Sequence, residues 1–132
     1  MVGLLGLVAA LAAGCGAVGR VTSGDPAAGK ALFVQKCGSC HTLADAGTKG
    51  TLGPDLDVAF AAAKGPMFAS AGTEQTIRDV VRGQIAYPES DPGTGHPGMT
   101  PNLLHGQQAR DVAVYVARCS NVPRCGVTAA PG

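Results

Sequence analysis

The sequence predicts an all-α domain of three to five short helices wrapped around a group that is not part of the polypeptide. Apolar residues recur at helical spacing in several segments, and no alternating run of β-branched residues indicates a strand of any length. Gly (20) and Pro (9) exceed a fifth of the 132 residues, and the chain has no Trp, two Tyr and three Phe. Because a domain this small buries only a modest core, a metal, disulfides or a bulky cofactor is expected at its centre.

The first helix is expected to begin at Pro26, with Asp25 as its N-cap, and to deliver Cys37 at its end. A second short helix is expected over residues 56–63, where a Gly-Pro pair follows it.

A third helix is expected to start with Thr73 as its cap and to end at Gly83. Its inner face is predicted to carry Ile77, Val80 and Val81.

The last helix is expected over residues 106–118, with His105 at its N-terminus. Its apolar stripe consists of Ala109, Val112, Ala113 and Val116. Gly29 and Phe33 are expected to meet Tyr115 where the first and last helices cross, because a glycine lets two backbones approach closely.

One short motif carries the chemistry. Residues 37–41 read Cys-Gly-Ser-Cys-His, which is the C-x-x-C-H pattern of c-type haem attachment. Two thiols at this spacing add across two haem vinyl groups, and the adjacent His41 is placed to ligate the iron. Two alternatives stay open here. A thioredoxin-like redox pair needs a preceding strand, and a zinc site needs two more ligands, for which Cys119 and Cys125 are available.

Four segments resemble the class I c-type cytochromes, a family of small mono-haem proteins. Residues 24–33 are similar to the family's first helix, and 52–56 contain its Gly-Pro-x-Leu turn. Residues 98–101 lie where the family has its ligand methionine, and 109–118 resemble its last helix. The resemblance implies a small cytochrome c fold, here over residues 25–126, around one covalently bound haem c.

The resemblance also implies the site residues. Cys37 and Cys40 would attach the haem, and His41 and Met99 would ligate its iron. The carbonyl of Pro54 would accept a hydrogen bond from the second ring nitrogen of His41, which orients the imidazole.

Other residues compete for the second axial position. His96 is three residues from Met99 and would give a bis-His site, whereas Met67 is expected at the haem edge or in the core. The long loop over residues 87–104 favours Met99, because four prolines stiffen it around that thioether.

The C-terminal region contains the second cysteine pair. Cys119 and Cys125 are expected to form a disulfide in an oxidising compartment, with two reduced thiols as the alternative. Residues 127–132 are expected to be a disordered tail. Four lysines are candidates to rim an exposed haem edge: Lys30, Lys36, Lys49 and Lys64.

The N-terminus predicts export. Residues 4–13 form an apolar run, and residues 12–15 (Ala-Ala-Gly-Cys) resemble a bacterial lipobox, although Ala12 stands where that motif usually has Leu. Residues 1–15 are therefore interpreted as an export signal with a lipoprotein-type anchor at Cys15, and 16–24 as a tether. An uncleaved membrane helix and ordinary cleavage beyond Cys15 are the alternatives.

These observations predict a single-electron carrier of a respiratory-type chain, exported to the periplasm or the outer face of the cytoplasmic membrane. The expected partners are redox proteins such as a membrane donor complex and a terminal oxidase. A net charge of +1 without a basic run argues against nucleic acid. An iron with both axial positions filled binds no substrate, so no enzyme is expected. The alternatives are peroxidase or small-gas chemistry at an opened iron, and a zinc or thiol-redox module.

Overall fold

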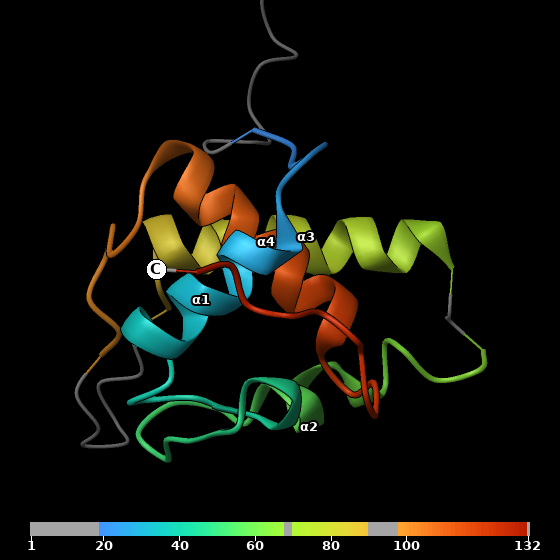
Figure 1. Cartoon of the computed structure of the whole chain (residues 1–132). Helices are drawn as coiled ribbons and strands as arrows, with labels where there is room; N and C mark the ends of the chain where they lie inside the picture. The colour runs from blue at the N-terminus through green and yellow to red at the C-terminus, as the bar shows by residue number, and fades with distance from the viewer. Residues whose placement is uncertain (1–18, 68–69, 90–97, 132) are drawn as a thin grey trace, which may run out of the picture.

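The computed structural model describes residues 19–67, 70–89 and 98–131. Over these residues the elements in order are α1 (Pro26–Lys36), β1 (Thr42–Leu43), the 3-10 helix η1 (Ala44–Ala46), β2 (Thr48–Lys49), α2 (Leu56–Ala61), α3 (Ala71–Ala86) and α4 (Gly106–Cys119). α4 packs against both α1 and α3 (Figure 1), and these three helices enclose the core. The predicted all-α class is confirmed, since the described strands form only a two-residue antiparallel pair.

α1 begins as the sequence predicts. The Asp25 side chain accepts hydrogen bonds from the amides of Ala27 and Ala28, and Pro26 occupies the first turn, where no amide donor is needed. The buried carboxylate of Asp111 on α4 accepts from the Asp25 amide at 2.8 Å. The start of α1 is thus fixed both by its own cap and by α4.

α1 and α4 approach each other closely where they cross. A Cβ added to Gly29 would lie 2.8 Å from Cβ of Tyr115 and closer still to the backbone of Asp111. The Phe33 and Tyr115 rings meet edge to face, with centroids 6.0 Å apart. The predicted contact of Gly29 and Phe33 with Tyr115 is confirmed, and the predicted α4 stripe is buried: Ala109, Val112, Ala113 and Val116.

A buried polar cluster lies beside this crossing. The Tyr115 hydroxyl donates to Asp45 Oδ2 at 2.8 Å, and Lys30 Nζ lies 3.0 Å from the same oxygen. Burial, reinforced by the hydrogen bond to Asp45, raises the pKa of Tyr115 above its ordinary value. The cluster ties α1, η1 and α4 together, and it removes Lys30 from the set of lysines free to rim a haem edge.

α3 departs from the prediction at both ends. Its N-cap is Ser70, whose hydroxyl accepts from the Thr73 amide, so the predicted cap at Thr73 is wrong by one turn. The helix also continues through Gly83 to Ala86, because Ile85 and Ala86 are buried beyond it. Burial of two such side chains outweighs the roughly 1 kcal/mol propensity penalty of an interior glycine.

The inner face of α3 is also only partly as predicted. Ile77 is buried and Val81 partly so, but Val80 is exposed. Ile85, which the sequence reading did not include, takes part in the main core cluster.

The predicted disulfide is confirmed, since Cys119 and Cys125 are bonded. The expected disordered tail is wrong for residues 127–131. Val127 is buried, its carbonyl accepts from Lys30 Nζ at 2.8 Å, and the Ala130 amide donates to the carbonyl of Ala27 at 3.0 Å. The tail is ordered because it finds backbone and side-chain partners on α1, across which it runs (Figure 1).

The expected tether is packed where the structure describes it. Val21 is buried, its amide donates to Asp79 Oδ1 at 2.8 Å, and its carbonyl accepts from Gln75 Nε2 at 2.9 Å. The folded domain therefore extends upstream of Asp25. The predicted export segment 1–15, with Cys15, lies outside the described residues. Within the described ranges, no helix has both the length and the apolar character needed to cross a bilayer.

Candidate haem site

The end of α1 presents two cysteines, Cys37 and Cys40, which are the free ones among the residues that the structure describes. The Cys37 amide still donates to Phe33 O at 2.8 Å, and the amides of Cys40 and His41 both donate to Cys37 O, at 3.1 and 2.9 Å. This single turn holds both thiols and the imidazole on one compact segment. Cys37 is 7% exposed and packs in the main core cluster, whereas Cys40 is only partly buried.

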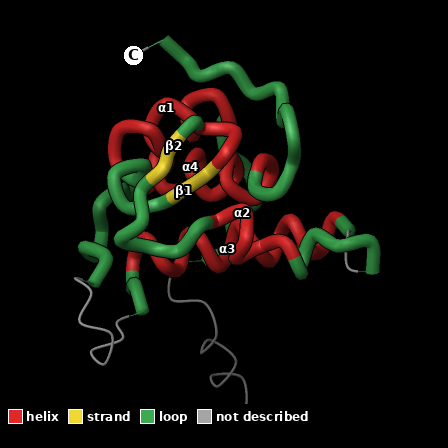
Figure 2. The backbone as a smooth tube through the Cα atoms, turned by 90° about the horizontal axis from the view of Figure 1, so that it is seen from below, coloured by secondary structure: helices red, strands yellow, loops and turns green. Residues whose placement is uncertain are grey.

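A small hairpin then returns the chain to this turn. β1 pairs with β2, and Gly47, with φ of 68°, supports the reversal between them. The hairpin lies on the same face of the molecule as α2 (Figure 2). Beyond it, the Gly53 amide donates to Cys40 O at 2.8 Å, which brings the following residue, Pro54, against His41.

The contact between His41 and Pro54 fixes the chemistry of the imidazole. His41 Nδ1 lies 2.9 Å from the carbonyl oxygen of Pro54. A carbonyl only accepts, so Nδ1 carries a proton, and in the neutral ring Nε2 then presents its lone pair. That tautomer is the one an axial ligand needs, and the contact expected from the sequence is present.

The absence of a side chain at Gly53 leaves room for the imidazole of His41. A Cβ at this position would lie 2.8 Å from Nδ1 and 3.0 Å from Nε2 of His41. The ring is thus seated directly on the bare backbone of Gly53. Two free thiols, a preset imidazole and this cradle fit a covalently attached haem with one histidine ligand.

The thiol chemistry separates this site from a redox dithiol. Burial, with a smaller contribution from Cys40, raises the pKa of Cys37 to about 11. A thioredoxin-type nucleophile needs the opposite shift, because the thiolate is the reactive form. The turn also follows a helix rather than a strand.

The zinc alternative loses its extra ligands. Cys119, Cys125 and Asp45 bring three potential ligand atoms within 4.8 Å of one another, but the two sulfurs are bonded to each other. A disulfide sulfur is not a thiolate and does not bind zinc in the usual way.

The candidates for the second axial position lie on other segments. Met99 is partly buried against the core cluster that includes Cys37, on the stretch between α3 and α4. Met67 is 85% exposed, so of its two predicted places the core is wrong and the haem edge stays a prediction. His96 lies outside the described residues.

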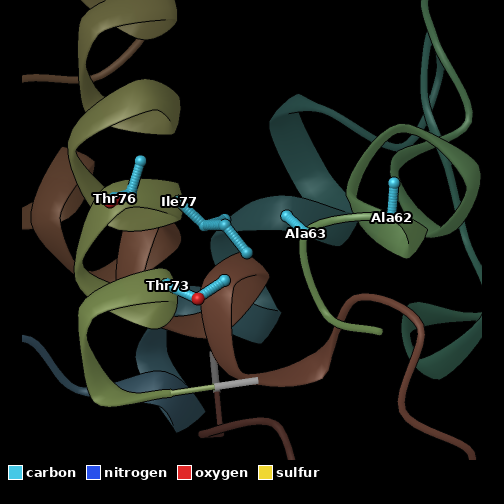
Figure 3. Close-up of a pocket in the computed structure, with 5 residues that line it drawn as sticks. All are labelled: Ala62, Ala63, Thr73, Thr76 and Ile77. Atoms are coloured by element: carbon cyan, nitrogen blue, oxygen red, sulfur yellow. The ribbon is translucent and has the colours of Figure 1, made fainter. Parts of the chain in front are cut away.

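A pocket of about 320 Å³ lies between the segment after α2 and one face of α3 (Figure 3). Its walls are mostly methyl groups, from Ala62, Ala63, Thr73, Thr76 and Ile77. It shares no residue with the cysteine–histidine turn and offers no strong metal ligand.

Sequence reasoning missed two carboxylates that shape the site. Asp55 caps α2 by accepting from the amides of Asp57 and Val58, and it directly follows Pro54. Asp57 accepts from the amides of Ala44 and Asn121. The pattern Asp-x-Asp at a helix start is a signal for the first role, but the partners of Asp57 are distant in sequence.

A helical domain that seats a histidine of fixed tautomer directly after two free thiols is, by class, a mono-haem protein with a covalently held cofactor. The family model for cytochrome c matches residues 26–120, and the chain therefore belongs to the cytochrome c family. Its cofactor is accordingly haem c, bound covalently. Members of this family carry electrons between redox proteins and are not enzymes, which confirms the predicted class of function.

Proposed function

We propose that this protein is a single-electron carrier of an extracytoplasmic, respiratory-type chain, with haem c attached at Cys37 and Cys40. His41 Nε2 and the Met99 sulfur would be the two axial ligands. When bound there, the haem supplies one-electron redox chemistry. The observation that carries the proposal is the hydrogen bond from His41 Nδ1 to Pro54 O at 2.9 Å, because it prepares Nε2 to bind a metal.

The segment around Met99 supports its assignment. The Asn102 amide donates to the Ile85 carbonyl at 2.7 Å, and Asn102 takes the left-handed conformation, with φ of 57°. Leu104 is buried just beyond it. A thioether is a weak ligand, so a segment anchored to α3 and to the core is what its retention requires.

Covalent attachment is tested on the exported holoprotein. Haem should remain with the chain on a denaturing gel, and Cys37→Ala/Cys40→Ala should abolish this staining. Haem that separates from the wild-type chain under denaturation contradicts the attachment.

The second ligand is tested by substitution. Met99→Ala should remove the sulfur-to-iron charge-transfer band and lower the reduction potential, because a methionine ligand favours the ferrous state. His96→Ala is the matched control and should leave both unchanged. The reverse pattern would assign the ligand to His96.

The bonded Cys119 and Cys125 support an oxidising, extracytoplasmic compartment.

We further propose that acyl chains at Cys15 hold the protein at the outer face of the cytoplasmic membrane, near a donor complex and a terminal oxidase. Cys15→Ser should release a redox-active protein from the membrane fraction. If the variant stays there with residues 1–14 attached, the anchor is an uncleaved helix.

Docking to such partners cannot use all four lysines that the sequence suggested. Lys30 pairs with the buried Asp45, and Lys64 Nζ donates to the carbonyls of Arg118 and Ser120. Lys36 and Lys49 remain exposed. Because the net charge is +1, electron transfer to a partner should depend only modestly on salt.

A further inference from the structure

Asp57 joins three segments that are far apart in the sequence. Its Oδ2 accepts from the Ala44 amide at 2.7 Å, and its Oδ1 accepts from the Asn121 amide at 2.6 Å. Ala44 follows the strand after His41, and Asn121 lies inside the loop closed by the disulfide. Bonds from amides to a carboxylate are stronger than neutral ones, so this carboxylate is a substantial link.

A second side chain repeats the link. Lys64 Nζ donates to the carbonyls of Ser120 at 2.7 Å and Arg118 at 3.1 Å. Asp57 lies in the first turn of α2 and Lys64 follows the end of this helix. The short α2 segment is therefore hydrogen-bonded on both sides to the C-terminal end of α4 and the disulfide loop.

The path from Asp57 to the imidazole is short and stiff. Asp55 accepts from the Asp57 amide at 2.9 Å, and the preceding Pro54 has its φ fixed by its ring. On the other side, Gly53 is bonded to Cys40 O at 2.8 Å. The Pro54 carbonyl, which accepts from His41, therefore lies between two hydrogen-bonded neighbours. Gly53 before it is bonded to Cys40, and Asp55 after it is bonded to the Asp57 amide.

We propose that Asp57 is a positioning residue for His41, which makes the disulfide loop a support for the Pro54 carbonyl. The proposal rests on His41 being the axial ligand. In this arrangement the disulfide limits the movement of Asn121, Asn121 holds Asp57, and Asp57 holds the start of α2 and with it the carbonyl. Loss of either the carboxylate or the disulfide loosens the hydrogen bond at Nδ1 while leaving both haem thioethers and the ligand itself in place.

The experiment measures deuterium exchange of the His41 Nδ1 proton in the ferric holoprotein by NMR, where the iron shifts that signal away from the others. Asp57→Asn keeps the side-chain size but removes one of two acceptors. Cys119→Ala/Cys125→Ala removes the disulfide without a change of charge. Each should speed the exchange about tenfold, the factor that corresponds to roughly 1.4 kcal/mol of lost protection.

The two changes combined should be no faster than the faster of them alone, because they act along one path. Asp79→Asn is the matched control, since its carboxylate also accepts from a backbone amide, that of Val21, but in another part of the fold. It should leave the exchange rate within about twofold of wild type, a change that corresponds to only about 0.4 kcal/mol.

An unchanged rate in Asp57→Asn would overturn the proposal, as would an equal acceleration in Asp79→Asn or multiplicative effects of the two changes. If Asp57→Asn does not fold, the disulfide variant decides alone, and an unchanged rate there overturns the proposal. If the iron shifts no imidazole N–H signal in the wild-type protein, His41 is not the ligand and the proposed function itself fails.

Discussion

Where α1 crosses α4, the protein is held by close packing of buried side chains. Residues 37–57, apart from the buried Cys37 and Leu43, are held mainly by directional hydrogen bonds nearer the surface. At the crossing, Gly29 leaves no room for a Cβ and the ring of Tyr115 is fully buried. In residues 37–57, which we call the haem segment, backbone groups are repeatedly hydrogen-bonded to backbone or side-chain partners, as between Gly53 and Cys40. The difference suggests that the crossing sets stability and the haem segment sets the environment of the imidazole.

Gly29→Ala should give the largest loss of stability. The new Cβ would meet the backbone of Asp111, which cannot move without moving α4. We expect the free energy of unfolding of the holoprotein to fall by about 3 kcal/mol, the upper end of typical overpacking costs. Denaturant unfolding followed by circular dichroism measures this. An unchanged midpoint would mean that the crossing yields more easily than its geometry implies.

Tyr115→Phe should have a smaller effect. It keeps the edge-to-face contact with Phe33 but leaves the buried Asp45 without one of its donors. Loss of a hydrogen bond to a charged group costs about 2 kcal/mol. The same denaturant measurement applies, and the absorption spectrum of the haem should be unchanged. A spectral change would show that the two regions are coupled through η1.

The contribution of Tyr115 to the free energy of unfolding can also be tested at high pH. Tyr115 has a pKa that burial raises in the folded state, so the folded state holds its proton more tightly than the unfolded state does. The stability from this group is complete below pH 10 and is lost as pH rises above it, by up to about 1.4 kcal/mol per pH unit. The slope of unfolding free energy above pH 10 should be smaller in Tyr115→Phe than in wild type. Equal slopes would place the titration on other groups.

Gly53→Ala tests the other region and should cost the least stability. Its Cβ would press on the His41 ring, but the surrounding loop lies near the surface and can yield. We expect about 1 kcal/mol or less of lost stability. The reduction potential and the hyperfine-shifted NMR signals of His41 should nevertheless change clearly. If Gly53→Ala loses much stability and keeps these signals, the haem segment contributes to stability rather than to the environment of the imidazole, and the comparison of the two regions is wrong.

The sequence predicted the parts of this molecule that local signals determine. Asp25 and Pro26 mark the start of α1, and the periodic stripe of α4 marks its buried face. The Cys-x-x-Cys-His spacing predicted the core of the site, because one turn of backbone suffices to build it. The contact of Pro54 with His41 came from the family resemblance rather than from spacing.

What the sequence did not reveal depends on distant partners. Ser70 and Thr73 are both possible caps by residue type, and the helix begins at the earlier one, Ser70. In the sequence Asp57 cannot be distinguished from a surface carboxylate, because its two donors, the amides of Ala44 and Asn121, reach it only in the folded chain. Val127 has no local pattern that predicts burial, and it is buried where the chain packs against α1 and Lys30 donates to its carbonyl.

The close approach of Gly29 to Asp111 also bears on the order in which the molecule is assembled. The two residues come from opposite ends of the domain, so the contact closes a long loop of the chain. Until it forms, Cys37 is not enclosed by the core cluster to which it belongs in the folded domain. We therefore expect the unfinished chain, rather than the folded domain, to be the form in which this thiol is most accessible to a haem vinyl group.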